Sequence, residues 1–113
     1  MSAALEKVDR EILDWIAEQT GDPALAAQLG AAQARKRDFT RTGFFVYFEP
    51  DAGAAPVPPG VRPVCPRLDA PGLMDGAGCD LFLRDGRLHY LEVYARGGFL
   101  PEPMESWQLG PDS

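Results

Sequence analysis

The chain has 113 residues, of which 45% are hydrophobic and 25% charged, and its formal net charge is −6. This length predicts a single domain over residues 1–113, built around one modest core. Because nucleic acids and anionic membrane surfaces are polyanions that repel an acidic domain, we expect neither among its partners.

The N-terminus has none of the features of a secretory leader. Charged residues recur every few positions over residues 1–21, and no apolar h-region interrupts them. No apolar run approaches the length that spans a bilayer. Cys65 and Cys79 fit a reducing compartment as well as they fit one disulfide. With a composition rich in Ala, Gly, Arg and Pro, these features predict a cytoplasmic bacterial protein.

Two helices are expected first. Apolar residues recur at helical spacing over residues 3–20, with Ser2 as the N-cap and Gly21 as the left-handed residue that ends the helix. The Asp-Pro pair at 22–23 favours a second helix over residues 23–35, antiparallel to the first. The basic run at 35–37 would then lie at its C-terminus, where cations complement the helix dipole; contact with phosphates is the alternative interpretation.

The next segment is rich in aromatic and β-branched residues and predicts one long strand over residues 39–49, inside the sheet. Gly43 would be a bulge or a close approach. One strand face would carry Phe44, Val46 and Phe48, and the other Phe45 and Tyr47, with both faces covered. Residues 61–68 predict an edge strand, because Pro63 and Pro66 cannot donate ladder hydrogen bonds.

Asp85-Gly86 between alternating apolar runs predicts a hairpin with a type I′ turn. A two-residue turn pairs Arg84 with Arg87 and Leu83 with Leu88. If the same register continues along both strands, Phe82 pairs with His89 and Cys79 with Glu92. The face expected to lie on the core would carry Cys79, Leu81, Leu83, Leu88, Tyr90, Glu92 and Tyr94.

The tail, residues 96–113, is too apolar for a free end and is expected to fold back, with a short strand near 106–109. These elements predict an α+β fold. In it, an N-terminal antiparallel helical hairpin packs on one face of a mostly antiparallel four- to five-stranded sheet over about residues 39–95.

Glu92 is the residue that chemistry singles out. A carboxylate on an apolar face, flanked by two tyrosines, needs a partner or a raised pKa. It either binds a cationic or hydrogen-bonding ligand, or pairs with an arginine or emerges into water as a structural residue. His89 is expected at the surface, without a nucleophile or an orienting carboxylate nearby.

No catalytic residue, metal or cofactor is expected. Cys65, Cys79, Asp80 and His89 lack the tight spacing of a transition-metal site, and the two cysteines are interpreted as small buried residues. The glycines of residues 72–78 lack the spacing, lysine and following helix of a phosphate loop.

The order of the motifs resembles a family of small uncharacterised bacterial proteins. That family combines an R-x-x-T-G-x-G-F-F-like tract with a segment of the form G-A-G-x-x-L-F-x-R-D-G-R-L-x-x-L-E-x-Y-x-Y. The resemblance covers about the C-terminal two-thirds of the chain, which departs from the pattern at Thr42 and Arg96. It supports the fold and implies no activity and no catalytic residue. The matching positions are Arg37, Thr40, Gly43, Phe44, Phe45, Gly76, Ala77, Gly78, Leu81, Phe82, Arg84, Asp85, Gly86, Arg87, Leu88, Leu91, Glu92 and Tyr94.

Three hypotheses follow, and a binding role is favoured over an enzymatic one. The first is a non-enzymatic protein-binding or accessory module with Phe99, Leu100 and Trp107 of the tail as anchors, and the immunity type that neutralises toxins is one form it can take. The second is a small-ligand protein or minor enzyme with a pocket between helices and sheet. The third is a homodimer joined through residues 61–68 or the helices. The pocket would be lined by Glu92, Tyr90, Tyr94 and Tyr47.

Overall fold

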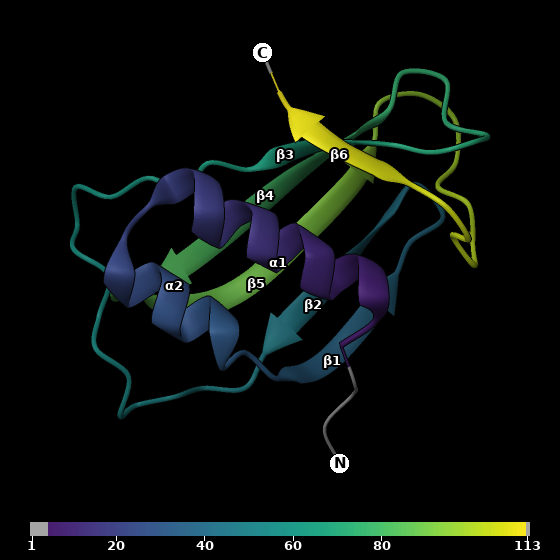
Figure 1. Cartoon of the computed structure of the whole chain (residues 1–113). Coiled ribbons are helices and arrows are strands. Elements are labelled where there is room, and N and C mark those ends of the chain that lie inside the picture. The colour runs from purple at the N-terminus through teal and green to yellow at the C-terminus, as the bar shows by residue number, and fades with distance from the viewer. Residues whose placement is uncertain (1–4, 113) are drawn as a thin grey trace.

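A computed structural model describes residues 5–112 as two helices packed against one antiparallel sheet (Figure 1). The strand order within these residues is β1-β2-β5-β4-β3-β6. The expected α+β class is confirmed, and the sheet has six strands in the described part of the chain, where four to five were expected. The elements are α1 Lys7–Thr20, α2 Pro23–Gly30, β1 Ala34–Phe39, β2 Gly43–Phe48, β3 Pro66–Asp69, β4 Ala77–Arg84, β5 Arg87–Ala95 and β6 Gln108–Pro111.

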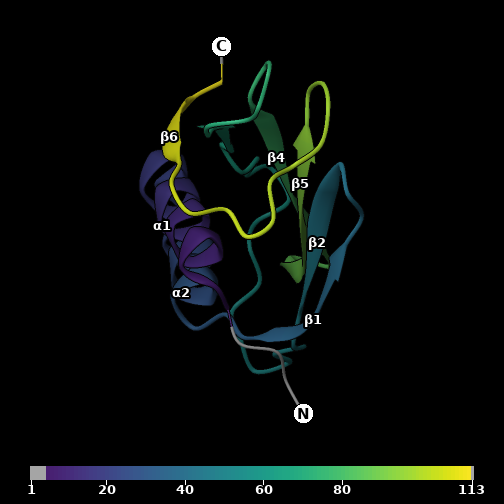
Figure 2. The same cartoon turned by 90° about the vertical axis from the view of Figure 1, so that its right-hand side faces the viewer.

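Both helices lie on one side of the sheet, and no helix of residues 5–112 covers the other side (Figure 2). The core fills the space between them and contains residues from every element except β6, together with two loop residues, Val57 and Leu100. Neither helix of residues 5–112 is long and apolar enough to cross a membrane. The sheet therefore has a covered face and an open face.

Helix α1 begins at Lys7 because Glu6 and Asp9 form a reciprocal capping box. The expected N-cap, Ser2, lies outside the described residues. The helix ends as expected at Gly21, whose φ of 70° places it in the left-handed region.

Helix α2 begins as expected, with the Asp22 side chain accepting a hydrogen bond from the Leu25 N–H. It ends at Gly30, however, so the predicted extension to residue 35 is wrong. Gly30 is a weak helix former, and Ala34 onward gains sheet hydrogen bonds by pairing with β2. The tertiary contacts of the sheet override the local helical preference of residues 31–35.

The predicted single strand over residues 39–49 is also wrong, because the chain reverses direction within it. Arg41 adopts a φ of 69°, and the Thr40 N–H donates to the Gly43 carbonyl, which closes a turn between β1 and β2. The basic run at 35–37 therefore lies in a strand instead of at a helix end. Gly43 is confirmed as a close approach, since a Cβ there would overlap the Val93 carbonyl.

Residues 61–68 form a strand only from Pro66, and that strand is internal instead of at the edge. β3 pairs with β4 on one side and with β6 on the other. Pro66 is tolerated because it is the first residue of the strand. The expected strand in the tail is confirmed as β6, shifted to residues 108–111, and it takes the edge position that β3 was predicted to hold.

Candidate functional site

The β4–β5 hairpin turns at Asp85 and Gly86 as expected. Their φ values of 54° and 75° are both positive, as a type I′ turn requires. Arg84 pairs with Arg87 and Leu83 with Leu88, but the register then shifts and Phe82 pairs with Tyr90. His89 is thus the extra residue of a β-bulge, and the predicted pairing of Phe82 with His89 is wrong.

Because of the bulge, the side chains of β5 after His89 point to the opposite sheet face from the one predicted. Cys79 pairs with Val93 instead of Glu92, and Leu91 and Val93 are fully buried against the helices. The prediction that Tyr90, Glu92 and Tyr94 lie on the core face is therefore wrong: all three lie on the open face. Because strand side chains alternate, one inserted residue moves every later side chain to the other side.

Four aromatic rings form a cluster at the centre of this open face. Tyr90 stacks on Phe82 with ring centroids 4.4 Å apart, and its centroid lies 5.9 Å from Phe45 and 5.7 Å from Tyr47. All four rings remain partly or largely exposed, and Phe82 is 39% exposed. Rings of this kind offer apolar contact area at low cost in side-chain entropy, because each has only two rotatable side-chain bonds. We call Phe45, Tyr47, Phe82 and Tyr90 the aromatic cluster.

A row of acidic residues crosses the sheet beside the aromatic cluster. Asp38 pairs with Phe45, Phe45 with Glu92, and Glu92 with Asp80 across four neighbouring strands. Asp38 has a cation nearby, since its Oδ2 lies 3.3 Å from the Lys36 Nζ. Asp80 and Glu92 stand directly opposite each other, and neither forms an ion pair with any residue of 5–112. Opposed like charges destabilise a sheet, so this pair has a cost that the fold itself does not offset.

Tyr94 bounds the acidic row on its far side. Its ring covers Gly78, where a Cβ would overlap it, and the Arg96 guanidinium carbon lies 5.9 Å from the ring centroid. The Arg96 Nη2 is 2.6 Å from Asp112 Oδ2. Hydrogen bonds to Asp112 and Tyr94 raise the pKa of Arg96, and the bond from Arg96 lowers the pKa of Asp112. The contact with Arg96 and the packing over Gly78 thereby fix the position of the Tyr94 ring.

The structure brings together on one sheet face the four residues predicted to line a ligand pocket, but not between the helices and the sheet. Tyr47, Tyr90, Glu92 and Tyr94 share the open face, on the side of the sheet away from the helices. The concavities near Phe48, Phe39 and Pro56 are lined by other residues. The predicted position of Glu92 between helices and sheet is therefore wrong, while a binding role for these residues stays a prediction.

The three predicted tail anchors differ in accessibility. Phe99 is 65% exposed, whereas Leu100 is 4% exposed and belongs to the core. Trp107 is half-buried, and its Nε1 donates to Glu11 Oε1 at 3.2 Å. Of the three, only Phe99 exposes most of its side chain to solvent.

The cysteines have the environment of structural residues. Burial raises the pKa of both thiols, and most strongly that of Cys79, so the reactive thiolate is disfavoured at neutral pH. Cys65 and Cys79 are both free thiols. Across residues 5–112, no group of three or more His, Cys, Asp or Glu side chains is arranged to hold a metal ion.

Sequence reasoning missed three members of the open face, namely Asp80, Phe45 and Phe82. The period-two alternation of β2 separates Phe45 and Tyr47 from the core residues, but it does not show that their face lacks a cover. The spacing of Leu88, Leu91 and Val93 contains a signal for the bulge. Leu88 and Leu91 are three apart, so both can pack against the core only if a residue is inserted between them.

No protein-family model, curated protein or solved structure matches this chain. The resemblance to the small bacterial family stays a prediction.

Proposed function

We propose that this chain is a non-enzymatic protein-binding module that docks a basic partner protein through the open face of its sheet. The observation that carries the proposal is the opposed pair of Asp80 and Glu92, unpaired within the described residues and bordered by four partly exposed aromatic rings. A partner Lys or Arg between the two carboxylates would relieve their repulsion.

Several features favour a protein over a small molecule as occupant. The face is a broad sheet surface spread over β1, β2, β5 and β4, and Glu92 does not line either concavity beside the β4–β5 turn. Aromatic anchors beside placed charges are typical of protein interfaces. The net charge of −6 steers a basic protein toward the chain at long range.

The test compares protein capture by charge-reversed variants that are matched in net charge. A tagged chain with Glu92→Lys is compared with one carrying Glu18→Lys, since Glu18 is exposed on α1, on the other side of the molecule. Proteins retained from an extract of the source organism are identified and quantified by mass spectrometry. Each retained protein is then purified and its affinity measured. We expect a basic protein that wild type and Glu18→Lys bind alike and that Glu92→Lys binds at least about tenfold more weakly.

A second pair of variants separates the open face from the tail. Phe82→Ala removes a ring of the aromatic cluster, and Phe99→Ala removes the exposed ring of the tail. The proposal requires loss of affinity with Phe82→Ala and not with Phe99→Ala. The reverse pattern, or equal weakening by Glu92→Lys and Glu18→Lys, would contradict docking on the open face.

A further inference from the structure

The cations of this acidic chain are unevenly distributed. Six of its eleven Lys and Arg residues form ion pairs with carboxylates within residues 5–112. Of the other five, three line one concavity of about 540 Å³ beside the β4–β5 turn: Arg35, Arg84 and Arg87. His89, the only histidine of the chain, lines it as well. We call this space the hairpin-end concavity.

The hairpin itself makes this arrangement costly. Arg84 and Arg87 stand directly opposite each other at the last pair before the turn. Two guanidinium groups on opposed positions repel each other, as the carboxylates of Asp80 and Glu92 do further along the same strands. An anion held near both arginines would convert this repulsion into attraction.

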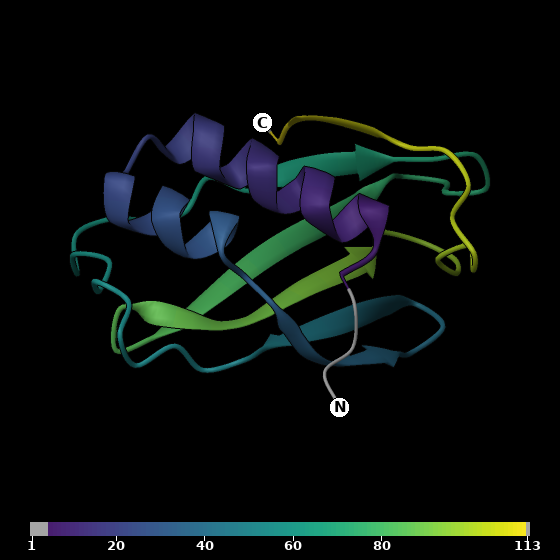
Figure 3. The same cartoon turned by 60° about the horizontal axis from the view of Figure 1, so that its bottom comes forward.

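Arg87 is fixed in place by backbone carbonyls instead of by a carboxylate. Its Nη2 donates to Ala54 O at 3.2 Å and lies 3.4 Å from Ala52 O, which ties the loop after β2 to the start of β5. Figure 3 shows this loop running beside the β4–β5 turn. The Nε of Arg87 is buried without a hydrogen-bond partner. The charge of Arg87 is thus positioned in advance but not neutralised by an ion pair.

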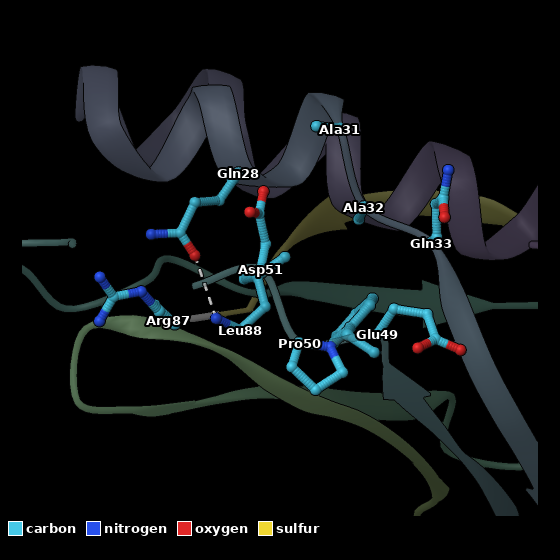
Figure 4. A pocket seen from close by; sticks show the side chains of 10 residues that line it. Gln28, Ala31, Ala32, Gln33, Glu49, Pro50, Asp51, Arg87 and Leu88 are labelled. Atoms are coloured by element: carbon cyan, nitrogen blue, oxygen red, sulfur yellow. Dashed lines mark hydrogen bonds between the residues drawn. The ribbon is translucent and has the colours of Figure 1, made fainter. Parts of the chain in front are cut away.

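Gln28 of α2 also connects the loop after β2 to the β4–β5 turn. Its Nε2 donates to the Ala55 and Gly86 carbonyls at 2.8 and 2.9 Å, and its Oε1 accepts from the Leu88 N–H at 3.0 Å. Figure 4 shows this amide above the start of β5, with Arg87 and Asp51 close by. Because three hydrogen bonds from a buried side chain already fix this part of the loop and turn, it loses little conformational entropy when a ligand binds.

Two carboxylates also line the concavity, and they do not cancel its charge. The Oδ1 of Asp51 accepts from the Gly53 N–H at 3.2 Å, and Asp85 lies at the turn. Neither forms an ion pair with Arg35, Arg84 or Arg87. With three guanidinium groups against two carboxylates, the site keeps a positive charge in a chain that is otherwise negative.

We propose that the hairpin-end concavity binds the phosphate group of a small phosphomonoester. Arg35 and Arg84, whose guanidinium groups have no hydrogen bond within the described residues, would donate to the phosphate oxygens, and Arg87 supplies a fixed third charge. Phe48 and Leu88 offer apolar contact to the organic body. The volume falls in the range of small-ligand sites, and a dianion gains more from three cations than a monoanion does.

Isothermal titration at constant ionic strength tests the proposal with three probes: phenyl phosphate, inorganic phosphate and benzoate. We expect saturable one-to-one binding of phenyl phosphate and weaker binding of the other two. Arg84→Gln should weaken it about 10- to 100-fold, the loss expected for a hydrogen bond to a charged group. Arg41→Gln is the matched control, because it removes the same charge from an exposed position in the turn between β1 and β2.

Thermal unfolding supplies a second readout. Phenyl phosphate should raise the Tm of wild type and of Arg41→Gln but not of Arg84→Gln, which must itself unfold cooperatively. Absence of saturable binding would overturn the proposal, as would equal weakening by Arg84→Gln and Arg41→Gln. Benzoate binding as tightly as phenyl phosphate would refute recognition of a dianion, and equal affinity for inorganic phosphate would refute a site for an organic ester.

Discussion

The two faces of the sheet are built from the same strands but meet different surroundings. On β5, Leu91 and Val93 are fully buried beneath the helices, while the alternate residues Tyr90, Glu92 and Tyr94 reach solvent. The covered face holds apolar side chains, Phe44 and Phe48 among them, in a continuous core. The open face carries aromatic rings and one opposed like-charged pair, Asp80 with Glu92.

This difference separates residues that stabilise the fold from residues available for recognition. Water screens opposed like charges on the open face, whereas the covered face would not tolerate them. Substitutions on the covered face should therefore change stability, and those on the open face should change binding.

The largest expected effect comes from truncating a core residue of β5. Leu91→Ala should lower the free energy of unfolding by about 2–5 kcal/mol, because it removes buried methyl groups and leaves a cavity. Denaturant unfolding measures this loss, and Tyr90→Ala, the preceding residue on the open face, is the matched comparison. Similar losses in the two variants would break the distinction between the faces.

A smaller effect of opposite sign is expected at Glu92. Glu92→Gln removes the repulsion with Asp80 and should raise the free energy of unfolding by about 0.2–1 kcal/mol. Glu18→Gln, on the exposed side of α1, should change it less. A loss of stability with Glu92→Gln would instead show that the negative charge of Glu92 stabilises the fold.

The smallest expected effect is a pH dependence of stability that comes from Asp9, a buried carboxyl group of α1. Burial raises the pKa of Asp9 above its ordinary value of 3.8, although the Glu6 N–H and Arg37 favour the charged form. The folded chain thus holds this proton more tightly than the unfolded chain. The stability that the protonated Asp9 carboxyl contributes is fully present below pH 3.8 and is lost as the pH rises through the raised pKa.

Unfolding titrations of wild type and Asp9→Asn over that pH range check the sign. We expect the stability of wild type relative to Asp9→Asn to fall as the pH rises. A relative rise would mean that the ion pair with Arg37, whose Nη1 lies 3.2 Å from Asp9 Oδ2, outweighs desolvation.

The sequence by itself determined the features that local interactions specify. The start of α2 at Asp22-Pro23, the end of α1 at Gly21 and the Asp85-Gly86 turn each depend on a few adjacent residues, and the structure confirms all three. The α+β class follows from the same patterns of apolar spacing.

Tertiary structure decided the features that depend on distant partners. Residues 34–39 became a strand because β2 offered hydrogen bonds, not because of their own preference. The bulge at His89 lets Leu88 and Leu91 both face the helices, while Gln28, sixty residues away, holds the Leu88 N–H. That one inserted residue placed Glu92 on the open face, because strand side chains alternate and a long-range contact fixes where the alternation shifts.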